Sequence, residues 1–312
     1  MDNKWNRRTF LKGSLAASTG LFLNPLDNIM AGNKAGSNKL SDSPIPKRPL
    51  GKTGNDVTIV GLGGLYTTSK HDRHEKAVEI VNRAIDLGIN YIDTSALYGT
   101  GASELNIGTV MKDRREEVFL ASKSHDYTYD GTMALIDQSL KRLQTDYLDL
   151  YQHHLLGGLG QLDQLQQKHS ARQAFEKLRD EGTIRNIGVT GHSAKVLADA
   201  LEDYPYDTAL ITLHAAEQVM DDPRHLDRFF RVAEEKGVGV IAMKVVARGA
   251  LTENGLDIRE LFPYVLSHSV WTAIIGITDI EYLEENVQVA REFQQLSNEE
   301  MAEIRKHAIN IA

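Results

Sequence analysis

The stretch that decides the fold prediction begins apolar and turns abruptly polar: Ile89-Asn90-Tyr91-Ile92-Asp93-Thr94-Ser95-Ala96-Leu97-Tyr98-Gly99. Residues 75–87 before it carry apolar side chains at helical spacing, and Gly88 ends that pattern. Residues 90–94 then form a short strand, and a second helix begins near Ser103. This order of helix, strand and helix is the unit that the rest of the chain repeats.

Eight short strands and eight helices alternate along the chain, with glycine-containing or polar loops between them. The strands are expected at residues 57–62, 90–94, 118–122, 147–152, 185–189, 209–213, 238–245 and 272–277. The helices are expected at 75–87, from 103 onward, and at 132–143, 171–180, 195–202, 226–236, 258–266 and 280–290. Such alternation predicts parallel strands, because each helix carries the chain back to the start of the next strand.

Two further segments frame the alternating units. Residues 48–57 place glycine and Asn55-Asp56 between short strands and should form a hairpin, and Ser297 caps a last helix over 298–308. A doubly wound open sheet is the alternative, but Gly61-x-Gly63 lacks the third glycine of a dinucleotide-binding turn. The sequence therefore predicts an α/β fold, a (β/α)8 TIM-type barrel with an N-terminal β-hairpin and a C-terminal extra helix.

The composition restricts the class of protein. A chain of 312 residues can bury one large core, and 41% hydrophobic with 25% charged residues is ordinary for a globular protein. A formal net charge of −8 argues against nucleic acid and anionic membranes as partners. Because the chain has no cysteine, it has no disulfide, thiolate metal site or cysteine nucleophile, and we expect no metal.

Residues 1–44 are expected to be an export signal and linker. Arg7-Arg8 and Phe10-Leu11-Lys12 precede a mildly apolar run over 13–23, an order that resembles a twin-arginine signal; a disordered basic tail is the alternative. The apolar run is too short to span a bilayer, so no stable membrane insertion is expected after processing. The signal predicts the twin-arginine export machinery as a partner and a periplasmic or otherwise exported protein; without it, the protein would be cytoplasmic.

Four polar side chains stand at the ends of neighbouring predicted strands. They are Asp93 and Tyr98 after the second strand, Lys123 after the third and His154 after the fourth. The carboxyl ends of barrel strands meet at one face, so these side chains should lie together and suit proton transfer. Taken singly, each has an ordinary structural alternative, as an ion pair, a loop aromatic or a core histidine.

The chain also resembles the aldo-keto reductases, from about Arg48 to the C-terminal helix. The resemblance rests on many stretches in the family's order: Pro49-Leu50-Gly51-Lys52-Thr53-Gly54, Gly61-Leu62-Gly63, residues 90–99, Leu148-Asp149-Leu150-Tyr151-Gln152-His153-His154, Ile187-Gly188-Val189, Gly239-Val240-Ile241-Ala242-Met243-Lys244 and Leu283-Glu284-Glu285-Asn286. It implies that residues 45–312 form one barrel domain that binds a nicotinamide dinucleotide at its mouth.

The resemblance assigns the family's four catalytic residues to Asp93, Tyr98, Lys123 and His154. His154 rather than His153 takes this role, because the family's histidine stands two residues after the Tyr-Gln pair. In the implied mechanism Tyr98 protonates the alkoxide that hydride transfer leaves. Lys123 lowers the pKa of Tyr98, Asp93 holds Lys123, and His154 donates a hydrogen bond to the carbonyl oxygen.

The resemblance also implies where the cofactor lies. The matching positions are Thr190, Gly191, Lys244, Gly276, Thr278, Glu285 and Asn286, with Arg248 as a further cation near the pyrophosphate. Two places depart from the family pattern. Gly191 stands where asparagine is usual, and Leu210 and Leu213 stand where glutamine and a stacking tyrosine are usual, which predicts aliphatic packing against the nicotinamide.

The expected cofactor is NAD(P)(H), with NAD(H) slightly favoured. Relatives that prefer NADPH often carry lysine or arginine where this chain has Gly276, Thr278 and Tyr282. Asp279 adds a carboxylate, which repels a 2′-phosphate.

The predicted function is an NAD(P)-dependent oxidoreductase that transfers a hydride between the cofactor and a carbonyl or alcohol substrate, an aldehyde, ketone or sugar. Two alternatives stay open: a redox-neutral sugar-modifying enzyme with tightly bound NAD(P), suggested by the export signal, and a non-catalytic barrel that senses cofactor. A hydrolase is disfavoured, because Asp93 is the only carboxylate among these strand ends. The loops 125–130 and 155–168 are expected to line the mouth, the second as a lid.

Overall fold

The computed structural model describes residues 43–216 and 223–311, whose main feature is a closed barrel of parallel strands. The strand order around the barrel is β10-β3-β4-β5-β6-β7-β8-β9. These strands are β3 (Val60–Gly63), β4 (Tyr91–Asp93), β5 (Phe119–Ser124), β6 (Leu148–His153), β7 (Ile184–Gly191), β8 (Thr208–Thr212), β9 (Gly239–Met243) and β10 (Thr272–Gly276). The predicted (β/α)8 barrel is confirmed.

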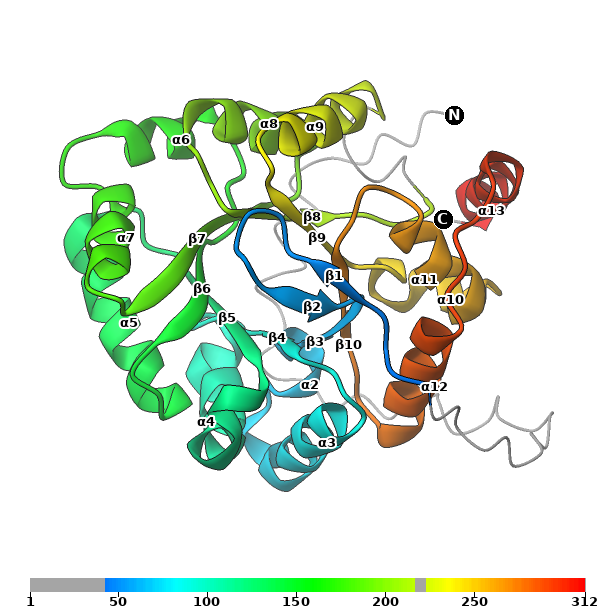
Figure 1. Cartoon of the computed structure of the whole chain (residues 1–312), viewed down its shortest axis with the longest axis horizontal. Coiled ribbons are helices and arrows are strands. Elements are labelled where there is room, and N and C mark those ends of the chain that lie inside the picture. The colour runs from blue at the N-terminus through cyan, green and yellow to red at the C-terminus, as the bar shows by residue number, and fades with distance from the viewer. Residues whose placement is uncertain (1–42, 217–222, 312) are drawn as a thin grey trace, which may run out of the picture. The chain divides into compact units, whose positions relative to one another are not determined.

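Helices surround the strand ring (Figure 1). Those near predicted positions are α3 (His74–Asp86), α4 (Ala102–Arg114), α5 (Tyr129–Leu143), α7 (Ala171–Asp180), α8 (Ala194–Asp203), α9 (Pro223–Glu235), α11 (Ile258–Leu266), α12 (Ile280–Arg291) and the extra α13 (Asn298–Ile311). Elements that the sequence had not indicated are α2 (Gly64–Thr67), α6 (Leu159–Gln166), α10 (Ala250–Glu253) and the 3-10 turns η2 (His71–Arg73), η3 (Tyr98–Gly101), η4 (Arg115–Glu117) and η6 (Ala247–Gly249). The predicted lid segment 155–168 thus contains a helix, α6.

Two apolar cores hold the barrel together. The larger one lies between the strands and the helices, where helical spacing on α3 buries residues such as Ile80, Val81 and Ala84. The smaller one includes Tyr91, Phe119, Leu150, Leu210 and Ile241. Because successive strand residues point to opposite faces, strands β4, β5, β6, β8, β9 and β10 contribute to both cores.

The predicted hairpin is present and closes the end of the barrel at which the strands begin. It consists of β1 (Lys47–Pro49) and β2 (Asp56–Thr58), paired antiparallel, and Figure 1 shows it in blue across the middle of the strand ring. Its Leu50 and Val57 are fully buried in the smaller core. Gly51 has φ +52° and lies so close to the backbone of Gly239 that a β-carbon would stand 2.2 Å from that nitrogen, so only glycine fits. The Arg48 guanidinium donates to the carbonyl oxygens of Leu266 and Val270.

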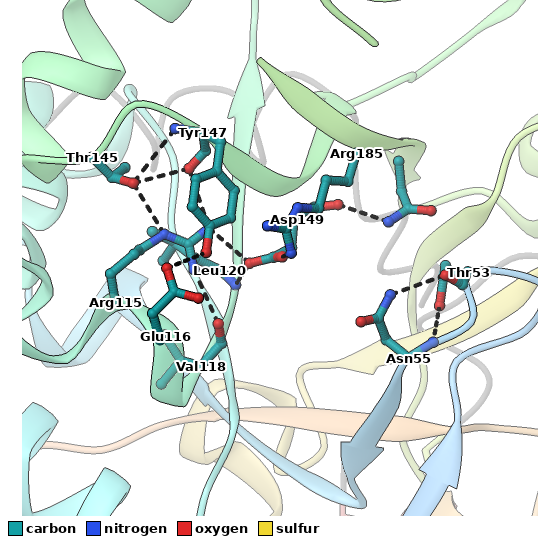
Figure 2. Close-up of polar contacts among 11 residues, drawn as sticks. Thr53, Asn55, Arg115, Glu116, Val118, Leu120, Thr145, Tyr147, Asp149 and Arg185 are labelled. Carbon is teal, nitrogen blue, oxygen red and sulfur yellow. Dashed lines mark hydrogen bonds and ion pairs between the residues drawn. The ribbon is translucent and has the colours of Figure 1, made fainter. Parts of the chain in front are cut away.

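A charged network ties β5, β6 and β7 together at the same end of the barrel (Figure 2). The Asp149 carboxylate accepts hydrogen bonds from Arg115 at 2.8 Å, from Arg185 at 3.1 Å and from the Leu120 backbone at 2.9 Å. The ring of Tyr147 lies between the two guanidiniums, at 3.9 Å from Arg115 and 4.1 Å from Arg185. Because this network is at the amino ends of the strands, we interpret it as structural.

Among residues 43–216 and 223–311, no helix combines the length and the apolar character needed to cross a bilayer. The twin-arginine motif and the rest of residues 1–42 lie outside the described residues.

Candidate active site

The four predicted catalytic side chains meet at the carboxyl ends of three adjacent strands. Asp93 is the last residue of β4, Lys123 lies near the end of β5, and His154 follows β6 directly. Tyr98 opens the η3 turn after β4. The register pairs Asp93 with Ala121 and Lys123 with Gln152, which sets the depth of each side chain in the barrel.

The centre of the site is a buried lysine that touches both a carboxylate and a phenol. The Lys123 ammonium donates to Asp93 Oδ2 at 2.5 Å, to the Thr94 carbonyl at 2.7 Å and to the Tyr98 hydroxyl at 3.3 Å. Gln152 donates to the other Asp93 oxygen at 3.3 Å. Lys123 and Asp93 are 0% exposed. All three Lys123 protons therefore have oxygen partners within the protein.

The burial of these side chains shifts the pKa values of Lys123 and Tyr98. Burial alone would lower the pKa of Lys123, but Asp93 and the Tyr98 oxygen raise it above its ordinary value, so the ammonium stays charged. Burial raises the pKa of Tyr98, and Lys123 opposes only part of that shift. The predicted net lowering of the Tyr98 pKa is therefore wrong for this state, because desolvation of the phenolate outweighs the ammonium. The phenol keeps its proton.

The two adjacent histidines occupy different environments. The Nδ1 atom of His154 lies 3.1 Å from the Ser95 hydroxyl, and its ring meets the Tyr98 ring edge-on at 5.7 Å between centroids. Burial and then the Lys123 charge lower the pKa of His154 to about 2, so its imidazole is neutral. His153 instead stacks on Phe175 at 4.1 Å within the fold. Only His154 lies beside the phenol.

A cavity of about 250 Å3 opens next to Asp93 and Tyr98. Its other walls come from the carboxyl ends of β3, β9 and β10 and from the segments that follow them: Gly63, Gly64, Leu65, Tyr66, Met243, Lys244, Val245, Val246, Arg248, Gly249, Ile274, Ile275, Gly276 and Thr278. Three predicted cofactor residues, Lys244, Gly276 and Thr278, thus share one cavity with the phenol.

The loop after β9 brings two cations to this cavity in an unusual backbone conformation. Lys244, Ala247 and Arg248 have φ of +65°, +49° and +64°, values that side-chain-bearing residues seldom adopt. Among the described residues no carboxylate lies within ion-pair distance of Lys244 or Arg248. Burial and then Arg248 lower the pKa of Lys244 to about 8. The loop therefore offers positive charge to a ligand in the cavity.

Thr190 and Gly191 lie at the end of β7 under the segment that follows β6. The Thr190 hydroxyl accepts a hydrogen bond from the Leu155 backbone at 2.9 Å, and its carbonyl accepts one from Leu156 at 2.7 Å. A β-carbon at Gly191 would stand 2.8 Å from the Leu156 carbonyl oxygen. Packing against the Leu156 carbonyl therefore requires glycine at position 191. Neither Thr190 nor Gly191 lines the cavity.

The remaining cofactor positions lie farther out on α12. Glu285 accepts from Arg259 at 2.5 Å, and Asn286 is buried; neither lines the cavity. Asp279 pairs with Lys76 at 3.7 Å, a cation that local sequence did not suggest.

Leu210 and Leu213, which the resemblance predicts to pack against the nicotinamide, do not line this cavity. Leu210 points into the smaller core and Leu213 into the larger one, because they belong to opposite faces of β8 and its continuation. Met243 and Ile274, which sequence reasoning missed, form the aliphatic wall. Met243 and Ile274 stand near the ends of β9 and β10, and these positions could have identified them from the sequence.

The parallel barrel, with a half-buried phenol beside a buried ammonium and carboxylate at its mouth, has the architecture of a barrel oxidoreductase. Residues 59–263 match the family model described as the Aldo/keto reductase family. The chain belongs to the aldo/keto reductase family, and its function is hydride transfer between a nicotinamide cofactor and a carbonyl or alcohol substrate.

Individual relatives cover most of the chain. Oxidoreductase YqkF of Bacillus subtilis (strain 168) is 30% identical over 84% of this chain and 96% of its own length. L-galactose dehydrogenase of Arabidopsis thaliana is 29% identical over 81% of this chain and 90% of its own. A solved aldo/keto reductase from Klebsiella pneumoniae in complex with NADP and acetate has a TM-score of 0.67 at 25% identity, covering 83% of this chain and 94% of that one.

Proposed function

We propose that Tyr98 is the proton donor to the carbonyl oxygen when this enzyme reduces an aldehyde, ketone or sugar. The observation that carries the proposal is the Tyr98 hydroxyl, 3.3 Å from a Lys123 ammonium that is itself held by the buried Asp93. A bound nicotinamide supplies the hydride. As the substrate oxygen gains negative charge, Tyr98 gives it a proton, and the adjacent Lys123 stabilises the phenolate that remains. In the reverse direction the phenolate takes the hydroxyl proton.

His154 and Asp93 have supporting roles in the same proposal. Because His154 is neutral, it can donate a hydrogen bond to the substrate oxygen without adding a charge. Asp93 keeps Lys123 charged and fixed in place. The burial of both members of this ion pair excludes water from the ammonium and the carboxylate, which strengthens the interaction between them.

The cavity and its rim fit the proposed cofactor. A volume of about 250 Å3 is below the roughly 300–1,000 Å3 of sites that enclose a whole drug-sized ligand, so the cavity holds the nicotinamide end. Met243 and Ile274 cover its apolar face. Lys244 and Arg248, which form no ion pair with a carboxylate in the described part of the chain, suit the pyrophosphate together with the backbone of that loop. Thr278, Glu285 and Asn286 remain our proposed contacts for the adenosine end. Thr190 and Gly191 remain proposed neighbours of the carboxamide, beyond the wall of this cavity, since neither residue lines it.

Both dinucleotides are proposed to bind, with NAD(H) slightly favoured. The positions at which NADPH-preferring relatives often carry arginine or lysine hold Gly276 and Thr278 here, which disfavours a 2′-phosphate. The two cations that line the cavity, Lys244 and Arg248, lie on the loop proposed for the pyrophosphate. Lys76 pairs with Asp279 and partly neutralises its charge, which reduces the expected difference in affinity between NAD(H) and NADP(H). The solved Klebsiella relative holds NADP. Direct titration with NADH and NADPH tests this, and a clear NADPH preference would reject it.

The decisive experiment measures cofactor oxidation with a panel of aldehydes and ketones, and cofactor reduction with a panel of sugars that includes L-galactose, because one relative is an L-galactose dehydrogenase. Tyr98→Phe should lower kcat by about 10²–10⁴ while leaving the cofactor Kd unchanged, since general acid catalysis contributes about that much. Tyr147→Phe removes a hydroxyl that contacts Glu116 at the opposite end of the barrel and is the matched control. If Tyr98→Phe keeps full activity, the proton donor is another group.

Export and a retained cofactor form a separate proposal, supported by the Arg7-Arg8 motif in the sequence. Replacing both arginines by lysine should hold the protein in the cytoplasm, as cell fractionation would show. Mass spectrometry of the natively purified protein then distinguishes an exchangeable cofactor from the tightly bound one that a redox-neutral sugar-modifying enzyme requires. A cofactor-free purified protein would reject the redox-neutral alternative.

A further inference from the structure

Ser95 is a fully buried hydroxyl that connects the backbone of the Tyr98 loop to the imidazole of His154. The backbone N–H of Leu97 donates to Ser95 Oγ at 3.1 Å. The same oxygen lies 3.1 Å from His154 Nδ1. No other side-chain contact of Ser95 is found among residues 43–216 and 223–311.

These two contacts determine the direction of the hydrogen bond between Ser95 and His154. A hydroxyl has one proton to donate and two lone pairs to accept with, and Leu97 occupies one lone pair. If Nδ1 carried the histidine proton and donated to Ser95, the hydroxyl proton of Ser95 would be buried without an acceptor. An unsatisfied buried donor costs about 1–3 kcal/mol. The favoured arrangement is therefore O–H of Ser95 donating to Nδ1.

The backbone on both sides of the imidazole is held as well. The His154 N–H donates to the Ser124 carbonyl at 2.8 Å, and the Tyr127 hydroxyl donates to the His154 carbonyl at 2.7 Å. The ring edge meets Tyr98. With its backbone fixed, the imidazole depends on Ser95 for the choice of which nitrogen carries the proton.

We propose that Ser95 is a positioning residue that fixes His154 in the tautomer with its proton on Nε2. The catalytic consequence of this tautomer rests on the proposed function. An N–H at Nε2 attracts a hydrogen-bond acceptor, a carbonyl oxygen or the oxyanion derived from it, whereas a lone pair there would favour a hydroxyl donor. Ser95 thus keeps His154 a hydrogen-bond donor to the substrate oxygen, and His154 orients that oxygen without transferring a proton to it.

The test is a nitrogen NMR measurement of the His154 tautomer in the full chain labelled with 15N-histidine. The chain has 11 histidines, so the His154 signals are assigned by their loss in His154→Gln. The unsubstituted protein should show a pyridine-type Nδ1 and a pyrrole-type Nε2. Ser95→Ala should give a mixed or reversed pattern, and Ser95→Thr, which keeps the hydroxyl, should restore the original one.

Kinetics provide the second readout. Ser95→Ala should lower kcat/KM for carbonyl reduction about tenfold, within the range of one hydrogen bond, and Ser95→Thr should recover most of it. A pyrrole-type Nδ1 in the unsubstituted protein, or an unchanged tautomer in Ser95→Ala, overturns the proposal. The NMR measurement does not require turnover. If the protein shows the expected tautomer but reduces no carbonyl, the tautomer assignment is supported and only the proposed function is rejected.

Discussion

Substituting methionine for Lys123 removes the ammonium and leaves the Asp93 carboxylate buried without its ion-pair partner. The two side chains are 0% and 1% exposed, so water cannot replace the lost interaction. Gln152 reaches only the other carboxylate oxygen, at 3.3 Å. Breaking a buried pair from one side costs about 3–5 kcal/mol. Methionine keeps most of the length and apolar packing of the side chain, so this cost arises from the charge.

The expected change is large enough for standard unfolding assays. At about 2–4 °C per kcal/mol for a domain of this size, Lys123→Met should lower the Tm by roughly 6–20 °C, measured by circular dichroism at pH 7. Adding Asp93→Asn removes the stranded charge, so the double variant should be more stable than Lys123→Met alone. A loss below about 1 kcal/mol in the single variant, or strictly additive losses in the double variant, would refute the reasoning.

Three further substitutions test other parts of the structure. Arg248→Ala should weaken cofactor binding about tenfold in a fluorescence titration, whereas Arg231→Ala on exposed α9 should not; equal Kd values would argue against the loop as the pyrophosphate site. Burial and then Arg172 lower the pKa of His153 from 6.5 to about 3. The unfolded state therefore binds more protons between these values, so stability rises with pH in this window, and is lost as the pH is lowered, by up to about 1.4 kcal/mol per unit; His153→Leu should flatten that slope in denaturant titrations, and an unchanged slope would contradict this. Asp149→Asn should lower the free energy of unfolding by about 2 kcal/mol and leave kcat intact, and lost activity in the folded variant would show that the network reaches the active site.

Much of the fold could be predicted because its signals are local. Helical spacing over 75–87 and the glycine at 88 define α3 without any tertiary information, and the alternation of elements defines the barrel. Helix α6 was missed because glycines and glutamines dominate 157–167. Its leucines at 159, 162 and 165 recur at helical spacing, and they were the signal that could have revealed it.

The four residues of the site could be predicted because strand ends gather at one face, but their energetics could not. The pKa of Tyr98 depends on how deeply the phenol is buried, which no local pattern encodes. The requirement for glycine at 191 arises from the Leu156 carbonyl, which belongs to a segment 35 residues earlier. The aliphatic wall of Met243 and Ile274 depends on which face of each strand points to the cavity, and one misjudged register moves every residue to the other face.

The hairpin that closes the barrel has a consequence for how the chain is synthesised. Arg48 bonds to carbonyls 218 and 222 residues later, and β3 needs β10 as its neighbour on one side. Because a ribosome delivers the amino-terminal part first, the hairpin emerges long before its docking surface exists. Until about residue 276 has emerged, β3 is an exposed strand edge, the kind of surface that pairs wrongly with other chains. The nascent protein therefore depends on protection of its first strands until nearly the whole chain has been made.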